Sequence, residues 1–261
     1  MISAHSIQFE ATGMSDQGQV RNTNEDAFFI DTAGGLFMVA DGMGGHRGGG
    51  VASRAVVQHL PSLLDRRLRT AHGSAKNALR DSILDLNAAI RTSGQQSSSL
   101  RGMGSTLACL LIRGGRATVA HMGDSRVYRW RGGLECLTQD HSVTALLVRE
   151  GEISARSAAH HPARGQLTRF IGMEQEIYPD VSSIRVRIGD RFMLCTDGLW
   201  GVLSDKRIAE YLASDAKLDI QCTNLISAAK EGGSQDNITC VLVSCENGKT
   251  WGHAAMRGET G

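Results

Sequence analysis

Short apolar runs bounded by turn residues recur along the chain. Runs of about four to eight apolar and β-branched residues between turn residues are typical of strands. On this basis we predict strands over the ranges 26–30, 36–40, 106–112, 117–121, 126–130, 191–196 and 238–244. The segments 113–116 and 131–133 each join neighbouring runs with too few residues for a helical crossover. Strands joined in this way pair antiparallel.

Two longer stretches between the second and third predicted strands have the spacing of amphipathic helices. Their apolar positions are Val56, Leu60, Leu63, Leu64 and Leu68 in the first stretch, and Leu79, Ile83, Leu86 and Ile90 in the second. Each set lies on one helical face, so we predict a helical hairpin. Further helices are predicted over 143–149, 205–212 and 220–230. Because helices and antiparallel strands come in separate runs, the pattern predicts an α+β fold.

A single domain accounts for this pattern. The 261 residues are 41% hydrophobic and 21% charged, which is the composition of an ordinary globular protein. We place the domain over 1–246. Within it, the polar stretch 141–178 is long enough to form a flap over a site. The Gly-rich tail 247–261 is expected to be frayed.

The charge balance argues against two classes of partner. There are 28 Lys and Arg against 27 Asp and Glu, so the net charge of +1 gives no electrostatic basis for binding nucleic acid or an anionic membrane. Segment 1–10 lacks the pattern of a signal peptide, and no run of about 18 apolar residues occurs. We therefore expect a cytoplasmic protein. The six cysteines form no C-x-x-C pair and are expected to be reduced core residues.

Aspartates stand at the ends of four predicted strands. Asp41, Asp124 and Asp197 follow strands, and Asp236 precedes one. A single aspartate beside a glycine is usually a turn residue, and Asp124 can also be interpreted as a turn cap. Four carboxylates that converge at one edge, however, repel one another unless cations neutralise them. Because the ligands are oxygens without a His or Cys cluster, Mg²⁺ or Mn²⁺ fits best. Gly42 would let its own carbonyl reach such an ion.

Other chemistries fail on spacing. The segment 42–50 follows a strand and precedes a helix, but Arg47 occupies the last glycine position of a dinucleotide loop and no Gly-Lys-Ser/Thr follows. No cysteine has an arginine six residues later, which removes the cysteine-phosphatase loop. The sequence contains neither G-x-S-x-G nor H-E-x-x-H.

A series of short motifs runs through nearly the whole chain. In order they are Asp16-Gln17-Gly18, Arg21, Asn24-Glu25-Asp26, Val39-Ala40-Asp41-Gly42-Met43-Gly44-Gly45-His46, Gly104-Ser105-Thr106, Gly123-Asp124-Ser125-Arg126, Asp140-His141-Ser142, Leu167-Thr168-Arg169, Thr196-Asp197-Gly198-Leu199 and Asp236-Asn237. Each is weak alone, but their shared order is specific. In this order they resemble the PPM family of metal-dependent protein phosphatases, the protein phosphatase 2C type, and its compact bacterial members in particular. The resemblance implies a four-layer α-β-β-α sandwich of two antiparallel sheets flanked by helix pairs.

The same resemblance implies a metal centre in a cleft at one end of the sandwich. Asp41 would bridge two ions, with the Gly42 carbonyl on one and Asp197 and Asp236 on the other. Asp124 and Asp197 would hold a third ion. The ions would be Mn²⁺ or Mg²⁺.

Three further residues take roles from the resemblance. Glu25 and Asp26 would lie in the outer shell and hold metal-bound waters. Arg21 would grip the phosphate oxygens in a forked contact, the alternative being a surface ion pair with Glu25. One departure concerns the proton donor to the leaving group. Eukaryotic members have a histidine where this chain has Met43, so a metal-bound water or His46 must supply the proton.

The resemblance therefore implies a protein serine/threonine phosphatase. A water bridging the ions would attack phosphorus in line with the leaving oxygen. Expected partners are phosphorylated proteins and a cognate Ser/Thr kinase with its targets, and control of type VI secretion is one known setting. Two alternatives stay open: a silent regulatory module that keeps the fold, and a phosphatase for small phosphoesters.

Overall fold

The computed structural model describes residues 7–44, 48–70, 74–176 and 178–247. Its strands form two antiparallel sheets. The first sheet has the order β1 (Ile7–Asp16), β11 (Ile238–Asn247), β10 (Arg191–Cys195), β7 (Arg126–Trp130) and β8 (Leu134–Cys136). The second has the order β2 (Asp26–Asp31), β3 (Leu36–Met43), β5 (Leu107–Arg113), β6 (Arg116–Met122) and β9 (Asp180–Arg185), with the short β4 (Gly104–Ser105) paired to β3.

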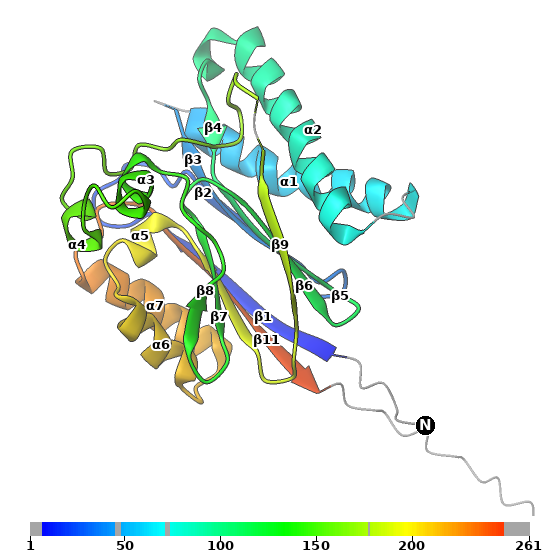
Figure 1. Ribbon diagram of the computed structural model, residues 1–261, viewed down its shortest axis with the longest axis vertical. Coiled ribbons are helices and arrows are strands. Elements are labelled where there is room, and N and C mark those ends of the chain that lie inside the picture. Colours follow the sequence, from blue (N-terminus) through cyan, green and yellow to red (C-terminus); the bar gives the residue numbers. More distant parts are fainter. Residues whose placement is uncertain (1–6, 45–47, 71–73, 177, 248–261) are drawn as a thin grey trace, which may run out of the picture.

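A helix pair covers the outer face of each sheet (Figure 1). Helices α1 (Gly48–Thr70) and α2 (Ala75–Gln96) pack on the second sheet, whereas α6 (Asp205–Ala213) and α7 (Leu218–Glu231) pack on the first. The shorter helices are α3 (Val143–Arg149), α4 (Ala155–Ala158), α5 (Asp197–Trp200) and the 3-10 helix η1 (Ser98–Leu100). The arrangement is the expected four-layer α-β-β-α sandwich, so the fold prediction is confirmed.

The core consists of three apolar layers, one between the sheets and one under each helix pair. Strand β5 shows how the sequence produces them. Its alternate residues Leu107, Cys109 and Leu111 face α1 and α2, while Ala108 and Leu110 face the other sheet. Successive side chains of a strand point to opposite faces. A strand covered on both faces therefore reads as a continuous apolar run.

Two longer strands, β1 and β9, were not predicted from the sequence. Both are edge strands, because β1 pairs only with β11 in its sheet and β9 only with β6. Their residues are mostly half-buried rather than fully buried. The polar positions of such strands dilute the apolar signal on which the prediction depends.

The segment 141–178, predicted to form a flap, lies between β8 and β9, and its described part contains α3 and α4. Ser142 caps α3 by accepting a hydrogen bond from the Ala145 N–H, at 3.3 Å between heavy atoms. An isolated bridge pairs Ser142 with Leu167. The predicted helix over 143–149 is confirmed. The predicted frayed tail lies outside the described residues, apart from Asn247 at the end of β11.

The cysteines follow the sequence prediction with one exception. All six are free, and five are buried, but Cys136 is exposed on the edge strand β8. The expectation that it is a core residue is wrong, because β8 has no strand on its outer side.

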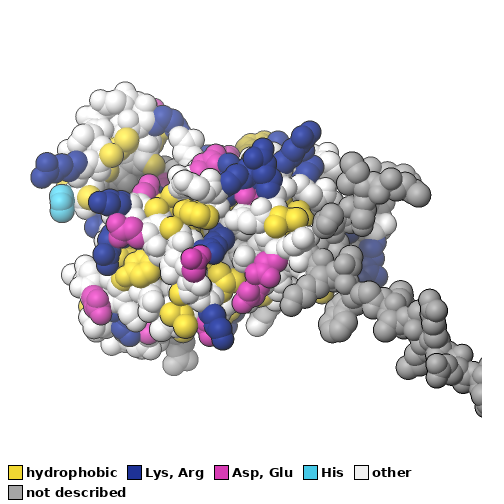
Figure 2. All heavy atoms as spheres, turned by 90° about the horizontal axis from the view of Figure 1, so that it is seen from below, with side chains coloured by type: hydrophobic (Ala, Val, Ile, Leu, Met, Phe, Trp, Pro, Cys, Tyr) yellow, Lys and Arg dark blue, Asp and Glu magenta, His cyan; other side chains and the backbone are white. Residues whose placement is uncertain are grey.

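Acidic, basic and apolar side chains are interspersed over much of the face shown in Figure 2. Among the helices within the described ranges, none is long and apolar enough to cross a membrane.

Candidate active site

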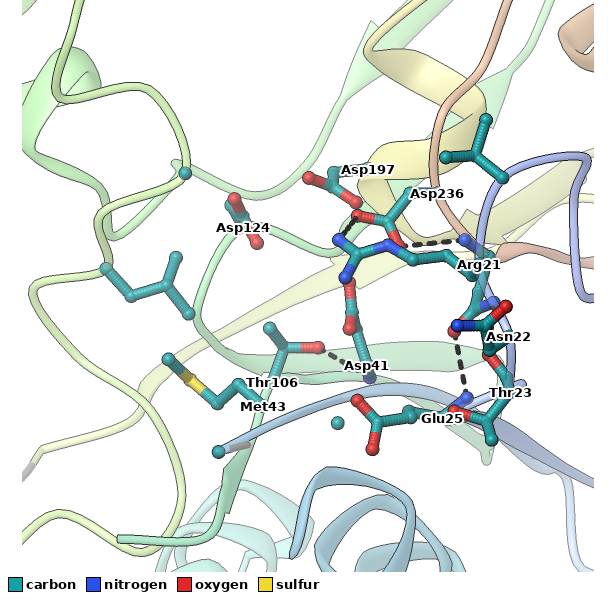
Figure 3. A pocket seen from close by; sticks show the side chains of 16 residues that line it. Arg21, Asn22, Thr23, Glu25, Asp41, Met43, Thr106, Asp124, Asp197 and Asp236 are labelled. Carbon is teal, nitrogen blue, oxygen red and sulfur yellow. Dashed lines mark hydrogen bonds and ion pairs between the residues drawn. The ribbon is translucent and has the colours of Figure 1, made fainter. Parts of the chain in front are cut away.

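The four predicted aspartates meet at one end of the sandwich (Figure 3). Asp41 lies in β3, Asp124 follows β6, Asp197 begins α5 directly after β10, and Asp236 precedes β11. They line a cavity of about 630 Å³. Three further predicted site residues also line it: Arg21, Glu25 and Gly42. Asp41 comes from the second sheet, Asp197 and Asp236 lie beside strands of the first, and Asp124 lies in the connection from β6 to β7, so the cavity forms where the sheets pack together.

Asp41 lies inside a strand rather than after one. Strand β3 continues through Met43 because Gly42 and Met43 pair with Ser105 and Gly104 of β4. The prediction that the strand ends before Asp41 is therefore wrong. The β4 segment is too short to be recognised from its apolar pattern, and it supplies the backbone partners that extend β3.

Thr106 fixes the backbone of Asp41, a role that sequence reasoning missed. The Asp41 N–H donates to Thr106 Oγ1 at 2.9 Å, and the Thr106 N–H donates to the Asp41 carbonyl at 2.8 Å. Thr106 Oγ1 also bonds Ser125 Oγ at 2.7 Å. With its backbone held in this way, Asp41 directs its carboxylate into the cavity (Figure 3). The only signal in the sequence was the place of Thr106 within a family motif.

Gly42 is required for close packing of the backbone. A Cβ atom built on Gly42 would lie 2.1 Å from the carbonyl oxygen of Gly49 in α1. No side chain fits there, so the strand and the helix start approach more closely than any other residue would permit. The suggested contact of the Gly42 carbonyl with a metal stays a prediction.

Asp26 lies behind the cavity and is 8% exposed. Its Oδ2 accepts hydrogen bonds from the hydroxyls of Thr196 at 2.9 Å and Thr239 at 2.7 Å. Its Oδ1 is buried and has no hydrogen-bond partner among the described residues, and the same holds for Oδ1 of Asp197. Buried carboxylate oxygens of this kind carry a large desolvation cost unless a cation or a donor satisfies them.

Burial, together with repulsion from neighbouring carboxylates, raises the pKa values of four aspartates: Asp26, Asp41, Asp124 and Asp197. Burial, opposed by the threonine hydrogen bonds and reinforced by Asp197 and Asp236, raises the pKa of Asp26 to about 7. Burial and Asp236 raise the pKa of Asp197 to about 6. The pKa values of Asp41 and Asp124 are raised well above their usual range, again chiefly by burial. This all-oxygen set of crowded, incompletely satisfied carboxylates fits hard divalent cations.

Arg21 lies at the mouth of the cavity and pairs with Asp236. Its Nη2 donates to Asp236 Oδ2 at 2.7 Å, which raises the pKa of Arg21. The alternative ion pair, with Glu25, does not occur among the described residues. The Arg21 side chain is 53% exposed. An ion pair this exposed is weak, so the guanidinium remains available to an incoming anion.

Asn237 holds the loop that carries Arg21, and sequence reasoning gave it no role. Its Nδ2 donates to the carbonyls of Gln17 and Thr23, both at 2.9 Å. Its Oδ1 accepts from the Glu25 N–H at 2.8 Å. Asn237 thus ties both ends of the loop between β1 and β2 to the start of β11.

Met43 lines the cavity. His46, the other residue considered as a proton donor, lies outside the described residues.

Known proteins resemble this chain in both sequence and fold. The family model described as protein phosphatase 2C matches residues 17–242. Protein phosphatase PhpP of Streptococcus pneumoniae serotype 2 is 35% identical over 244 residues, covering 90% of this chain and 97% of PhpP. The crystal structure of the Mycobacterium tuberculosis serine/threonine phosphatase PstP/Ppp matches with a TM-score of 0.84 at 35% identity, covering 92% of this chain and all of that one. A structure of the PstP catalytic domain in complex with two manganese ions matches at 33% identity with a TM-score of 0.83, covering 93% and 100% of the two chains.

The sandwich and its acidic cavity define a metal-dependent phosphatase. The chain belongs to the protein phosphatase 2C, or PPM, family and is a compact member of the bacterial type. It is a serine/threonine protein phosphatase that depends on Mn²⁺ or Mg²⁺.

Proposed function

We propose that Asp41, Asp197 and Asp236, with the Gly42 carbonyl, hold two divalent cations, and that Asp124 and Asp197 hold a third. The observation that carries the proposal is the pair of buried, unpartnered oxygens, Oδ1 of Asp26 and Oδ1 of Asp197, beside this cluster. Raised pKa values indicate that the carboxylates repel one another in the absence of cations. Bound cations would satisfy the unpartnered oxygens and would offset the repulsion between the carboxylates.

Arg21 is proposed to bind the phosphoryl group of the substrate. It lines the cavity beside the aspartates, and its planar guanidinium suits two phosphate oxygens at once. Asp236 orients it through their 2.7 Å ion pair. Glu25, at the cavity wall, and Asp26, behind it, would hold waters of the metal centre in place.

Bound Mn²⁺ or Mg²⁺ would supply an acidic water and neutralise charge that develops on the phosphoryl oxygens. The chain's own groups orient the phosphate and fix the carboxylates. The Met43 thioether carries no proton that it could donate, so this side chain is not the acid for the leaving oxygen.

The described part of the segment 141–178 is proposed to act as a flap of one catalytic unit that spans 1–246. Leu167 and Gly165 from this segment line the cavity, which supports a role in substrate access. A cognate Ser/Thr kinase, whose targets this enzyme would dephosphorylate, is part of the same proposal. So is a cytoplasmic location, where reducing conditions would keep the free thiols reduced.

Asp197→Asn tests the proposal. We expect Mn²⁺-dependent release of phosphate from a phosphothreonine peptide to fall at least about 100-fold, because a ligand shared by two ions is lost. Asp215→Asn, at an exposed position between α6 and α7, is the control and should act like the unchanged protein. Undiminished activity of Asp197→Asn would overturn the proposed site. Equal specificity constants for the peptide and a small aryl phosphate would favour a phosphatase for small esters.

A further inference from the structure

The backbone around Asp124 is held from two sides. The Asp124 carbonyl accepts a hydrogen bond from Trp200 Nε1 at 2.9 Å. The preceding residue, Gly123, exchanges two hydrogen bonds with His141: its carbonyl accepts from the His141 N–H at 2.9 Å, and its N–H donates to His141 Nδ1 at 3.3 Å. Gly123 has a φ of +97°, and a Cβ there would lie 2.6 Å from Thr106 Cγ2. Only glycine fits this turn without strain, and its two hydrogen bonds leave the backbone little freedom to aim Asp124 elsewhere.

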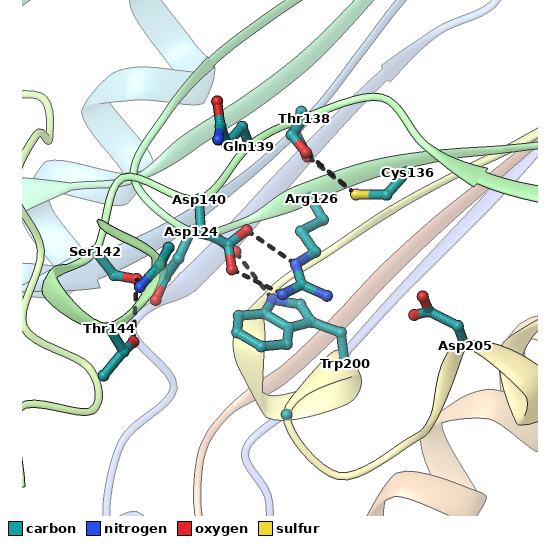
Figure 4. A network of polar contacts seen from close by, with 12 residues as sticks. Asp124, Arg126, Cys136, Thr138, Gln139, Asp140, Ser142, Thr144, Trp200 and Asp205 are labelled. Atoms are coloured by element: carbon teal, nitrogen blue, oxygen red, sulfur yellow. Dashed lines mark hydrogen bonds and ion pairs between the residues drawn. The ribbon is translucent and has the colours of Figure 1, made fainter. Parts of the chain in front are cut away.

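On one side of the turn, the Trp200 side chain is held by Arg126, which forms an ion pair with Asp140 (Figure 4). The Arg126 guanidinium lies 3.5 Å from the centroid of the Trp200 ring, which is a close cation–π contact. Arg126 also donates to both carboxylate oxygens of Asp140, at 2.9 and 2.7 Å, and to the Tyr128 hydroxyl at 2.8 Å. The Arg126 and Asp140 side chains are only 22% and 10% exposed. Asp140 thus orients Arg126, and Arg126 orients the indole.

On the other side of the turn, the His141 ring has a defined tautomer. Because His141 Nδ1 accepts from Gly123, its proton sits on Nε2, which faces Asp180 Oδ2 at 3.3 Å. Arg169 donates to the other oxygen of Asp180 at 2.8 Å. The His121 ring stacks on His141 with centroids 4.4 Å apart, and burial lowers the pKa of His141 to about 4. The neutral ring therefore has no lone pair at Nε2 for a cation, which favours a structural use of this His-His-Asp group.

The hydrogen bonds on both sides lead to one dipeptide, Asp140-His141, and neither of its residues is among the described residues that line the substrate cavity. We propose that Asp140, His141 and Trp200 are positioning residues that hold the Asp124 carboxylate in place for the third cation. The inference rests on the proposed role of Asp124. Burial and the charge of Asp197 oppose a carboxylate at this position, so the backbone anchors would offset that repulsion.

Trp200→Phe is the direct test, because it keeps an aromatic ring near Arg126 and removes the indole N–H together with the five-membered ring that carries it. We expect calorimetry to show the Asp124-dependent Mn²⁺ ion binding about threefold to tenfold more weakly, the loss expected for one hydrogen bond. The Mn²⁺ concentration for half-maximal activity should rise in step, with an unchanged KM for a phosphothreonine peptide. The matched control is Trp130→Phe, a half-buried tryptophan beneath Arg191, which should bind Mn²⁺ as the unchanged protein does.

A double-mutant cycle distinguishes the positioning of Asp124 from a general loss of structural stability. In an Asp124→Asn background, Trp200→Phe should not weaken Mn²⁺ binding further, because the ligand that it positions is already absent. Equal weakening in both backgrounds, or no weakening in either, would overturn the inference. If Asp124→Asn itself left the number of bound ions unchanged, the proposed third-ion site would fail instead.

A second variant keeps the test decisive if Trp200→Phe destabilises the fold. Arg126→Lys keeps the charge but loses the fork to Asp140. Thermal unfolding of the metal-free protein reports on folding, and the cycle is then run with this variant. Weaker Mn²⁺ binding that depends on Asp124 supports the inference, and binding like that of the unchanged protein contradicts it.

Discussion

The carboxyl group of Asp26 ties the two sheets together directly behind the cavity. It belongs to β2 of the second sheet, whereas of its hydrogen-bond donors Thr239 belongs to β11 of the first sheet and Thr196 directly follows β10 of that sheet. Oδ2 thereby accepts two hydrogen bonds, while Oδ1 has no partner within the described ranges. A residue with one structural oxygen and one unsatisfied oxygen can serve both the fold and the metal centre.

Asp26→Asn separates these two uses. The amide oxygen can still accept from the two threonines, but an NH₂ group then replaces the unpartnered oxygen. We expect the fold to persist and Mn²⁺-dependent activity to fall about 10-fold to 100-fold, as for loss of an outer partner of a metal centre. Mn²⁺ titrations of activity measure this.

Asp31→Asn, in the same strand, provides the control for Asp26→Asn. Asp31 Oδ1 accepts from the Gly34 N–H, far from the aspartate cluster along β2. It should change neither the Mn²⁺ dependence nor the maximal rate. A normal Mn²⁺ dependence in Asp26→Asn would show that Asp26 serves the fold alone.

At the scale of elements, the loop between β1 and β2 depends on Asn237. Asn237→Ala removes three hydrogen bonds to the backbone of residues 17–25. We expect KM for a phosphothreonine peptide to rise about tenfold, since Arg21 loses its support and each lost bond is worth about 1 kcal/mol. Steady-state kinetics measure the effect.

Gln221→Ala is the matched control for Asn237→Ala. Gln221 is a buried amide whose Nε2 also donates to two backbone carbonyls, those of Ser214 and Ala216, but it lies in α7 and holds the loop between α6 and α7. We expect lower stability and an unchanged KM. If both variants raise KM alike, loss of stability rather than the loop explains the result.

The apolar pattern predicted most of the strands and helices at the centre of the fold. It missed strands that form through pairing with a neighbouring strand rather than through burial of both faces. Strand β5 is apolar throughout because both of its faces are covered, so its sequence alone reveals it. The edge strand β1 has polar positions, and the two-residue β4 exists only through its pairing with β3. The extension of β3 beyond Asp41 followed from that pairing and could not be predicted.

The residues of the candidate site likewise include some that the sequence pointed to and others that only the structure places there. The convergence of the four aspartates followed from their positions at or near strand ends, and the family resemblance added Arg21; all five residues line the same cavity. The contacts of Thr106, Trp200 and Asn237 join segments far apart in sequence, and a hydroxyl, indole or amide has many uses. Only the packing of the elements assigns them to the site.

At the scale of the whole molecule, the site lies between two sheets that each contribute like charges. Asp41 comes from the second sheet, Asp197 and Asp236 lie beside strands of the first, and Asp124 lies in the connection between the two sheets. Packing the sheets buries these carboxylates and brings them together, so folding without metal raises the pKa values of Asp41, Asp124 and Asp197. Metal binding and sheet packing are therefore energetically linked.

This linkage gives the stability a defined dependence on pH. Asp26 and Asp197 titrate at about 7 and 6 when folded, against the usual 3.8, so the folded metal-free state holds protons that the unfolded chain has lost. Their stabilising contribution is full below about pH 4 and is lost as the pH rises through the folded pKa values. The lowered pKa values of His121 and His141 act in the opposite direction, but only below about pH 6.5.

Between pH 6.5 and 8, the metal-free protein should therefore become less stable. We expect Tm to fall by several degrees, because about 1 kcal/mol shifts the Tm of a domain this size by roughly 2–4 °C. With saturating Mn²⁺ the slope should reverse, because the ions bind deprotonated carboxylates and protons compete less as the pH rises. Thermal unfolding with a chelator and with Mn²⁺ measures both slopes. A Tm that is independent of pH without metal, or parallel slopes in the two series, would contradict the linkage between the aspartate cluster and the packing of the sheets.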